Sequence, residues 1–527
     1  MKLKNAALKV AVLALACALA GCGSDGSAGA VATNSSADPS SIGSTASSGG
    51  DSSGAGDSYP VGGTVSGLTG TGLVLQINGS QTLAVNTNGS FSFPTTLPGG
   101  SAYSVTVQSQ PSVAREICGV SNGSGTVGTS AVDNVGVSCA TVLGYMYELD
   151  FSTSQIFSYG IDSKTGNVIP FGTSIGSGGG NPTSILVSTD GRHLYVANET
   201  ASSVSGLTTL SGYVGSLATF AVDADTGQLT LEGTPVSAAP ITAQLAVAGE
   251  FLFVFNNYML VPGMNSPPPT LMEYVLDPTS GLPTLLGTPL TFATENQFFA
   301  MAVSPNQQFL YVLSGDPEAN TPVWPTLTVY AIDAVSGAIA AGQSMIVQVN
   351  CNSISIDPQG RFLYLETAPP FSPLGPASAI VLPYAIDPTT GSLTAVGTGT
   401  SVATNGGPIV IDPSGHYLYA VNDLNAGAPS NTIQALSIDQ SAGALSTMGP
   451  IIETDGATIS AGGLIFDPSG EFLYLVSATE TNSQATGTAL TTFTVSGASG
   501  SAGQLVPSGA PQQLPIGIGG SSIAIVE

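Results

Sequence analysis

The sequence predicts an all-β chain in which a small β-sandwich precedes a seven-bladed β-propeller. Charged residues make up only 8% of the 527 residues, whereas glycine (67) and proline (35) are abundant. This composition is typical of short strands joined by turns. A unit of roughly 55 residues recurs along the C-terminal two thirds of the chain, and such a period indicates propeller blades. No long stretch repeats apolar residues at helical spacing.

The first 21 residues have the pattern of a secretory leader. Three lysines precede an apolar run that is too short for a dedicated membrane span. The run ends in Leu19-Ala20-Gly21-Cys22, which resembles the bacterial lipobox. The resemblance implies cleavage before Cys22 and attachment of lipid to that residue. We therefore expect an extracytoplasmic protein held to a bacterial membrane, the outer one because Gly23 rather than Asp follows. Whether it faces the periplasm or the cell surface stays open.

Residues 22–58 consist almost wholly of Gly, Ser, Ala, Thr and Asp. They have too few large apolar side chains to offset the entropy lost on ordering, so we expect a flexible tether. Residues 59–140 are predicted to form a small β-sandwich similar to immunoglobulin-like or carboxypeptidase-regulatory-like domains. Short alternating strands there are separated by Asn-Gly pairs at Asn78 and Asn88, a strong hairpin signal. Cys118 and Cys139 lie in this domain and can form a disulfide in an oxidising compartment.

Residues 141–527 are predicted to form the propeller, because two short units alternate along them. The first is a turn followed by a strand with a marker aromatic at Tyr195, Phe253, Tyr311, Tyr364, Tyr419 and Tyr474. The second is an Asp followed four residues later by Gly, at Asp162, Asp223, Asp277, Asp333, Asp387 and Asp439. Such an Asp accepts hydrogen bonds from backbone amides, and Gly takes the left-handed conformation. The second unit is therefore a hairpin turn, and each repeat contains four short strands.

The ends of the repeat array predict the number of blades. Six full repeats run from residue 181 to about residue 515. Residues 143–180 supply three further strands, and residues 521–525 resemble the missing first strand. Together they complete a seventh blade, which closes the ring without exposed edges. We expect Ile523 to lie beside the strand that contains Tyr147.

The two units, Asp-Pro-x-Gly-x-Phe-Leu-Tyr at 357–364 and Ile-Asp-x-x-x-Gly-x-Leu at 438–445, resemble the motifs of lactonase-type seven-bladed propellers. That family includes a 6-phosphogluconolactonase. The resemblance implies a seven-bladed ring and lactone hydrolysis by His, Arg and Glu at the mouth of the channel. No position of this sequence matches those catalytic residues, so the catalytic residues stay unassigned.

The alternating strand direction divides the repeat turns between two faces of the ring. The motif face carries the two recurring turns, and the variable face carries the long loops at 198–214, 256–270, 314–325, 366–378, 422–431 and 477–488. The propeller's basic residues and histidines all fall in motif-face turns: Lys164, Arg192, His193, Arg361 and His416. We interpret them as turn residues. A phosphorylated lactone needs cations around its phosphate, and the variable face has none.

Acidic and aromatic residues mark the variable face as the candidate ligand face: Glu199, Asp316, Trp324, Glu366 and Asp423. Exposed aromatics beside acids suit a carbohydrate, a lactone or a protein ligand. The alternative for Trp324, the only tryptophan, is that it packs under its own loop. The chain has 33 acidic and 7 basic residues, which excludes nucleic-acid binding because no basic patch can form.

The sequence leaves three functions open. A lipid-anchored binding or scaffold module at the cell envelope is preferred. The alternative is a lactone hydrolase of the 6-phosphogluconolactonase-like type, in which Glu366 or Glu199 activates water. The third is a purely structural spacer or adhesion module. We expect a monomer without a cofactor. The hydrolase alternative leaves a divalent metal open but unsupported, because two histidines in distant blades cannot form a histidine-rich metal site.

Overall fold

The computed structural model describes residues 57–527 except 113–114, 201–213, 239–241, 257–267, 294–296, 316–324, 348–350, 368–378, 403–406, 422–431, 454–457, 482–483, 498–501 and 515–521. Every regular element of the described residues is a β-strand. Within them, no helix has the length and apolar character needed to cross a membrane. The predicted leader, Cys22 and the predicted tether lie outside the described residues except for Asp57 and Ser58.

The N-terminal part consists of two four-stranded sheets around one apolar core. One sheet has the order β5 (Gly89–Ser92), β2 (Val61–Ser66), β10 (Val132–Asp150), β8 (Glu116–Ser121). The other has the order β4 (Gln81–Val85), β3 (Leu73–Ile77), β7 (Ala102–Ser109), β9 (Ser124–Thr126). Two short strands, β1 (Ser58–Tyr59) and β6 (Leu97–Pro98), pair separately. Alternate residues of both sheets, among them Val61, Leu75, Val105 and Val137, fill the core, as expected for a sandwich. We call this part the small domain.

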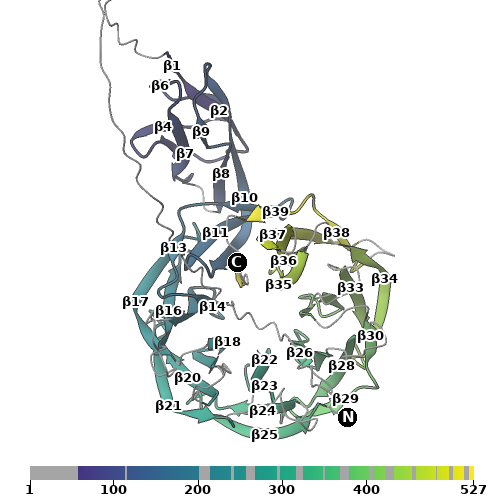
Figure 1. Ribbon diagram of the computed structural model, residues 1–527. Helices are drawn as coiled ribbons and strands as arrows, with labels where there is room; N and C mark the ends of the chain where they lie inside the picture. The colour runs from purple at the N-terminus through teal and green to yellow at the C-terminus, as the bar shows by residue number, and fades with distance from the viewer. Residues whose placement is uncertain are drawn as a thin grey trace, which may run out of the picture.

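The remaining strands form seven antiparallel sheets arranged as a ring (Figure 1). Blade 1 contains β40 (Ile523–Val526), the second half of β10, β11 (Gln155–Asp162), β12 (Val168–Pro170) and β13 (Ile175–Gly176). Blade 2 contains β14 (Pro182–Val187), β15 (His193–Thr200), β16 (Val214–Val222) and β17 (Leu229–Ala238). Blade 3 contains β18 (Thr242–Ala248), β19 (Phe251–Asn256), β20 (Thr270–Leu276) and β21 (Pro283–Thr291). Blade 4 contains β22 (Gln297–Val303), β23 (Phe309–Gly315), β24 (Thr326–Ile332) and β25 (Ile339–Ile346).

The last three blades follow the same order from the channel outwards. Blade 5 contains β26 (Cys351–Ile356), β27 (Phe362–Thr367), β28 (Ala379–Ile386), β29 (Leu393–Ala395) and β30 (Thr400–Val402). Blade 6 contains β31 (Ile409–Ile411), β32 (Tyr417–Val421), β33 (Thr432–Ile438) and β34 (Leu445–Glu453). Blade 7 contains β35 (Thr458–Phe466), β36 (Phe472–Thr481), β37 (Gln484–Val495), β38 (Leu505–Pro507) and β39 (Gln512–Leu514). Strands β14, β18, β22, β26 and β35 lie innermost in Figure 1.

The ring closes as the sequence predicts. In blade 1, β40 pairs with β10, so that Ala524 lies opposite Tyr147 and Ile523 opposite Glu148. Strands from the two ends of the propeller sequence therefore share one sheet. This arrangement satisfies the backbone of both edges and leaves no open seam in the ring.

A hydrogen bond from the marker tyrosine, which is Tyr147 in blade 1, joins six of the seven blades to the next. The hydroxyl donates to the carbonyl of the recurring glycine in the next blade's outer hairpin, over 2.7 to 3.2 Å: Tyr147 to Gly227, Tyr195 to Gly281, Tyr311 to Gly391, Tyr364 to Gly443, Tyr419 to Gly503 and Tyr474 to Gly166. The last of these spans the seam between blades 7 and 1. Blade 3 has Phe253 at this position and lacks the hydroxyl. We call this tyrosine–glycine contact the latch.

A second aromatic explains why the latch residue in the next blade is glycine. Two positions before each marker, a ring lies against that glycine, and a Cβ built there would fall 2.2 to 2.5 Å from it: Tyr145, His193, Phe251, Phe309, Phe362, Tyr417 and Phe472. The seven glycines also have φ between +66° and +79°, where side chains are disfavoured. The strand with the marker aromatic in one blade and the Asp…Gly hairpin turn of the next blade thus form the two sides of one interface between blades.

The small domain and the propeller share a strand. β10 runs for 19 residues. Its first part pairs with β2 and β8, and its last part pairs with β11 and β40. The domain boundary predicted after Ala140 therefore falls inside a continuous strand. A strand pattern in sequence does not reveal where its partners change, which is why a break was expected there.

Candidate functional site

The described part of the variable face contains two of the five candidate ligand residues. Asp316, Trp324 and Asp423 lie outside the described residues. Glu199 is near the end of β15 in blade 2, and Glu366 is near the end of β27 in blade 5. Because these blades are not neighbours in the ring, the structure does not bring the two carboxyl groups together.

Glu199 is a partly buried carboxyl group at the edge of the variable face. Its N–H donates to the carbonyl of Asn181 over 3.0 Å, which fixes the end of β15. It lies four residues beyond Tyr195, so its side chain is on the face of the sheet that meets blade 3. Opposite it on β16 is Gly215, which has no side chain to fill the adjoining space.

The surroundings of Glu199 disfavour its charge. Burial raises the pKa of this carboxyl group to about 7, because a charge loses hydration when water is excluded. A carboxyl group with this pKa is about half ionised at neutral pH and is a stronger base than an exposed glutamate. Groups with such shifts are frequent at functional sites.

Glu366 differs because it is completely buried. It lies only two residues beyond the latch residue Tyr364 and faces blade 6, within the interface between blades. Cys351 lies opposite Thr367, the residue after Glu366, in the register of β26 and β27. It is also buried, and burial and the charge of Glu366 raise the pKa of its thiol to about 12. Glu366 has no surface with which to meet a ligand.

A ring of buried polar residues supports the variable face, and the sequence analysis missed it. Each member lies three residues after the marker aromatic of its blade. The described members are Asp150, Asn198, Asn256, Ser314, Thr367 and Ser477. Several of them bind the adjoining loops. Asp150 accepts hydrogen bonds from Ser152 and Thr153, and the side-chain amide of Asn198 donates to the carbonyl of Ser177 over 3.0 Å. Counting from the marker aromatic in each repeat reveals this ring.

The basic residues and histidines of the motif face contact their own turns or the next blade. Arg361 forms an ion pair with Asp357 at 3.1 Å and donates to the carbonyl of Gln440 in the outer hairpin of the next blade. His193 packs against Gly281. These contacts are those of turn and packing residues.

A hollow of about 700 Å³ lies on the motif face between blades 6 and 7, and His416 and Ser414 line it. The two side chains are 2.9 Å apart. However, the hydroxyl of Ser414 donates to the carboxylate of Asp412. The imidazole must then donate to Ser414 rather than accept its proton. This is the reverse of what an activated serine needs.

The structure offers no metal centre in the residues it describes, where no three His, Cys, Asp or Glu side chains gather suitably. The Asp223-Ala224-Asp225 turn uses its first carboxylate to bind its own backbone. The carboxylate of Asp223 accepts from the amides of Asp225 and Thr226, which is the expected turn geometry.

Comparison with known proteins supports the propeller. Residues 145–259 match the family model described as "Lactonase, 7-bladed beta-propeller". A search of curated proteins found no match. Among solved structures, a proposed 6-phosphogluconolactonase from Bacteroides uniformis is 19% identical, with a TM-score of 0.54 over 73% of this chain and 99% of that one.

Two further solved structures have the same fold. A proposed 6-phosphogluconolactonase from Bacteroides fragilis is 17% identical, with a TM-score of 0.51 over 73% of this chain and 98% of that one. A protein from Lactobacillus plantarum is 15% identical, with a TM-score of 0.52 over 73% of this chain and 99% of that one. By its ring of seven sheets, the C-terminal part of this chain is a seven-bladed β-propeller, and its residues 145–259 are similar to the lactonase family of that fold.

Proposed function

We propose that the protein hydrolyses an uncharged lactone at the variable face, with Glu199 as the general base. The observation that carries the proposal is the setting of Glu199. It is a half-buried carboxyl group opposite a glycine, its pKa is about 7, and it lies within the segment that matches the lactonase family model.

The reaction needs one water molecule and one proton acceptor. The Glu199 carboxylate takes a proton from water as the water oxygen attacks the lactone carbonyl. The tetrahedral intermediate then collapses, the carbonyl carbon–ring oxygen bond breaks, and the protonated Glu199 returns the proton to the leaving oxygen. The product is an open-chain hydroxy acid.

The charge of the propeller limits the substrate. Its basic residues are in motif-face turns, and none occurs in the sequence of the variable-face loops. A phosphate or carboxylate on the substrate would meet only carboxylates there, which is unfavourable. We therefore propose a lactone without an anionic substituent, in contrast to a phosphorylated one.

Turnover of neutral lactones by the purified full-length protein tests the proposal. Glu199→Gln should lower kcat by about 10²- to 10⁴-fold, the usual contribution of a general base. Glu232→Gln, on the outer strand of the same blade, should leave kcat unchanged. The wild-type rate should rise with pH through about 7, since Glu199 must be ionised to accept a proton. No turnover across a panel of neutral lactones would contradict the proposal.

A binding role remains as the second candidate, because the described carboxyl groups of the variable face are dispersed over separate blades. Under this role a sugar or lactone raises the thermal stability of the protein without being consumed. The anchor is proposed with either role. Cys22→Ser should abolish incorporation of labelled fatty acid and release the protein from the membrane fraction, and unchanged labelling would contradict lipid attachment at Cys22.

A further inference from the structure

We infer that the small domain is a rigid stalk that holds the propeller by its rim and leaves both mouths of the central channel open. The inference does not depend on the proposed hydrolysis. It begins with β10, which belongs to both domains and contains no loop between them. Among the described residues, a continuous strand rather than a linker therefore joins the two domains.

Backbone hydrogen bonds fix the junction on both sides of β10. The amide of Val142 donates to the carbonyl of Arg115 over 2.9 Å, and the amide of Ser163 donates to Thr141 over 2.9 Å. The amide of Arg115 donates to Asp225 in the outer hairpin of blade 2 over 3.0 Å. The end of the small domain at Arg115 and the outer hairpins of blades 1 and 2 are thus hydrogen-bonded to one another or to β10 at the junction.

Arg115 shows how tightly this junction is determined. It has φ of +60°, a conformation that residues other than glycine rarely adopt. Its guanidinium also donates to the carbonyl of Leu143 over 3.0 Å. A strained residue persists where its surroundings fix it from several sides, and Arg115 is held by its amide, its carbonyl and its side chain.

The apolar core of blade 1 extends into the small domain. Ile117 of β8 and Val142 of β10 are 1% and 3% exposed and belong to the same cluster as Tyr145 and Tyr147. Gly160 of β11 lies directly under Ile117 and Val142, and Gly119 of β8 lies against Ile169. Relative movement of the domains would expose this shared core to water, which is unfavourable.

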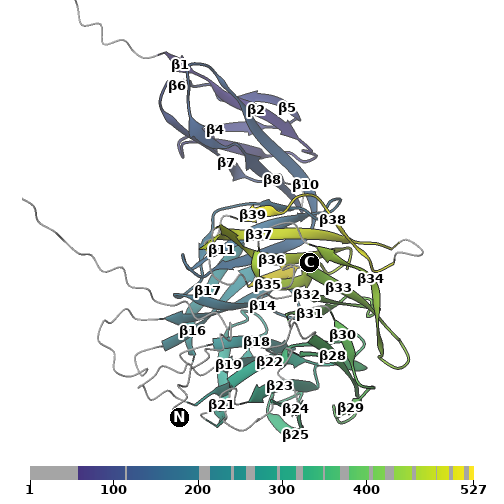
Figure 2. The ribbon, with the colours of Figure 1, turned by 45° about the vertical axis from the view of Figure 1, so that its right-hand side comes forward.

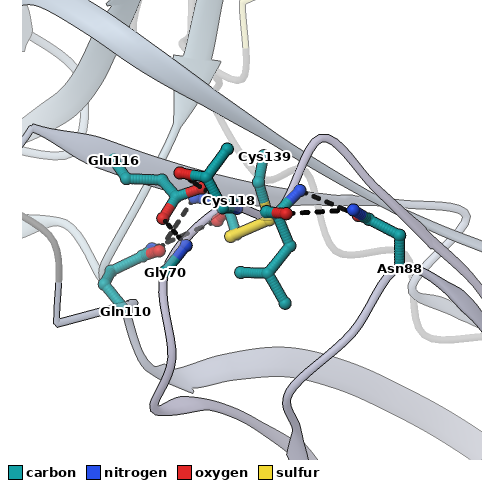
Figure 3. The surroundings of a disulfide bond; sticks show 8 residues. Gly70, Asn88, Gln110, Glu116, Cys118 and Cys139 are labelled. Carbon is teal, nitrogen blue, oxygen red and sulfur yellow. Dashed lines mark hydrogen bonds between the residues drawn. A yellow bond between two sulfur atoms is a disulfide. The ribbon is translucent and has the colours of Figure 1, made fainter.

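The disulfide stiffens the end of the small domain that adjoins the propeller (Figure 3). Cys118 and Cys139 face one another on β8 and β10, close to the junction. The buried carboxylate of Glu116, two residues before Cys118 on β8, accepts from the amides of Thr69 and Gly70. The two strands that enter the junction are therefore fixed to each other and to the loop that follows β2.

The position of the stalk decides what it leaves accessible. In Figures 1 and 2 the small domain projects outward from the rim of the ring beside blade 1, with β1 at its far end. In neither view does it lie over the centre of the ring. A propeller held in this way presents its variable face to a dissolved ligand whatever lies beyond the stalk.

Pulsed electron-spin distance measurements on the full-length chain test the inference. Cys17→Ser and Cys22→Ser remove reactive thiols, and Cys351 is buried. One spin-label pair, Thr82→Cys with Val335→Cys, reports the distance between small domain and propeller. A reference pair, Lys164→Cys with Val335→Cys, reports the distance across the ring alone. We expect the two distance distributions to be single and of similar width.

An interdomain distribution more than about twice as wide as the reference, or one with two maxima, would overturn the inference. A Gly-Ser insertion between Ala140 and Thr141 gives the comparison for free movement, and it should broaden only the interdomain pair. If that variant does not fold, the comparison of the two native pairs still decides.

Discussion

Glu199 is a residue whose burial should be measurable in the stability of the whole protein. Its pKa is near the ordinary value of 4.5 in the unfolded chain and about 7 in the folded protein. A group whose folded pKa is raised stabilises the fold below the unfolded pKa and loses that contribution as pH rises through the folded one. The stability of the wild type should therefore fall between about pH 5 and about pH 8.

Urea unfolding at these two pH values, compared with Glu199→Gln, measures this contribution. The variant cannot ionise at this position, so its free energy of unfolding should fall less over the same interval. Glu232→Gln is the matched control and should follow the wild type. Equal pH dependence in wild type and Glu199→Gln would show that the carboxyl group is not buried as described.

Phe253 is the one marker position at which the latch lacks its hydroxyl. Phe253→Tyr should add a hydrogen bond to the carbonyl of Gly337 and raise the free energy of unfolding by about 0.5 to 1 kcal/mol. Tyr311→Phe in the next blade removes an equivalent bond and should lower it by about 1 kcal/mol. Chemical denaturation of both variants checks the pair. Destabilisation by Phe253→Tyr would mean that the ring cannot accommodate the hydroxyl.

The sequence placed Glu199 and Glu366 on the same face but could not separate their burial. Both follow a marker tyrosine at the end of a strand, and loop assignments from sequence are uncertain by a few residues. The count from the marker distinguishes them, because Glu366 is two residues beyond its tyrosine and Glu199 is four beyond. Because Glu199 lies two residues further from its tyrosine, it reaches the edge of the variable face, whereas Glu366 is enclosed between blades.

At the scale of the element, the glycine of the latch is needed both for its left-handed backbone conformation and for its contact with an aromatic ring. Substitutions can separate these two reasons. Gly391 has φ of +69°, and an added Cβ would lie 2.5 Å from the ring of Phe309. Gly397, on the same blade, has the same φ with nothing within 4 Å. Gly397→Ala should cost about 1 to 2 kcal/mol from backbone conformation alone.

Gly391→Ala adds the clash with the aromatic ring, so it should cost about 1 to 3 kcal/mol more than Gly397→Ala. Thermal and urea unfolding of the two variants give the difference. Equal losses would show that the aromatic contact is not needed for the joint between blades.

The strands and turns of the propeller were predictable because their chemistry is local. An Asp that accepts nearby amides and a Gly in the left-handed conformation act within five residues, so they recur visibly in each repeat. The latch joins residues about 80 positions apart within the array and 308 apart at the seam, so it was not visible as a contact. The shared strand β10 was missed for a related reason, since pairing partners are set by tertiary structure.

At the scale of the whole molecule, the disulfide should stabilise the small domain more than the propeller. It closes a loop over a sequence separation of 21 residues, and the double variant Cys118→Ala/Cys139→Ala should lose about 3 kcal/mol. Hydrogen exchange followed by mass spectrometry should show the loss chiefly in β2, β3 and β8. Exchange that increases evenly over all seven blades would contradict a local effect.

The closure of the ring also has a consequence in time. During synthesis the small domain is made before the propeller, and β10 is made with it. Its propeller half is the centre of blade 1, yet its inner partner β40 is made after every other described strand of the ring. Blade 1 therefore keeps an unpaired inner edge while some 370 further residues are synthesised. A chain that is truncated before Ile523 lacks the inner strand of blade 1, which is the blade that the small domain adjoins.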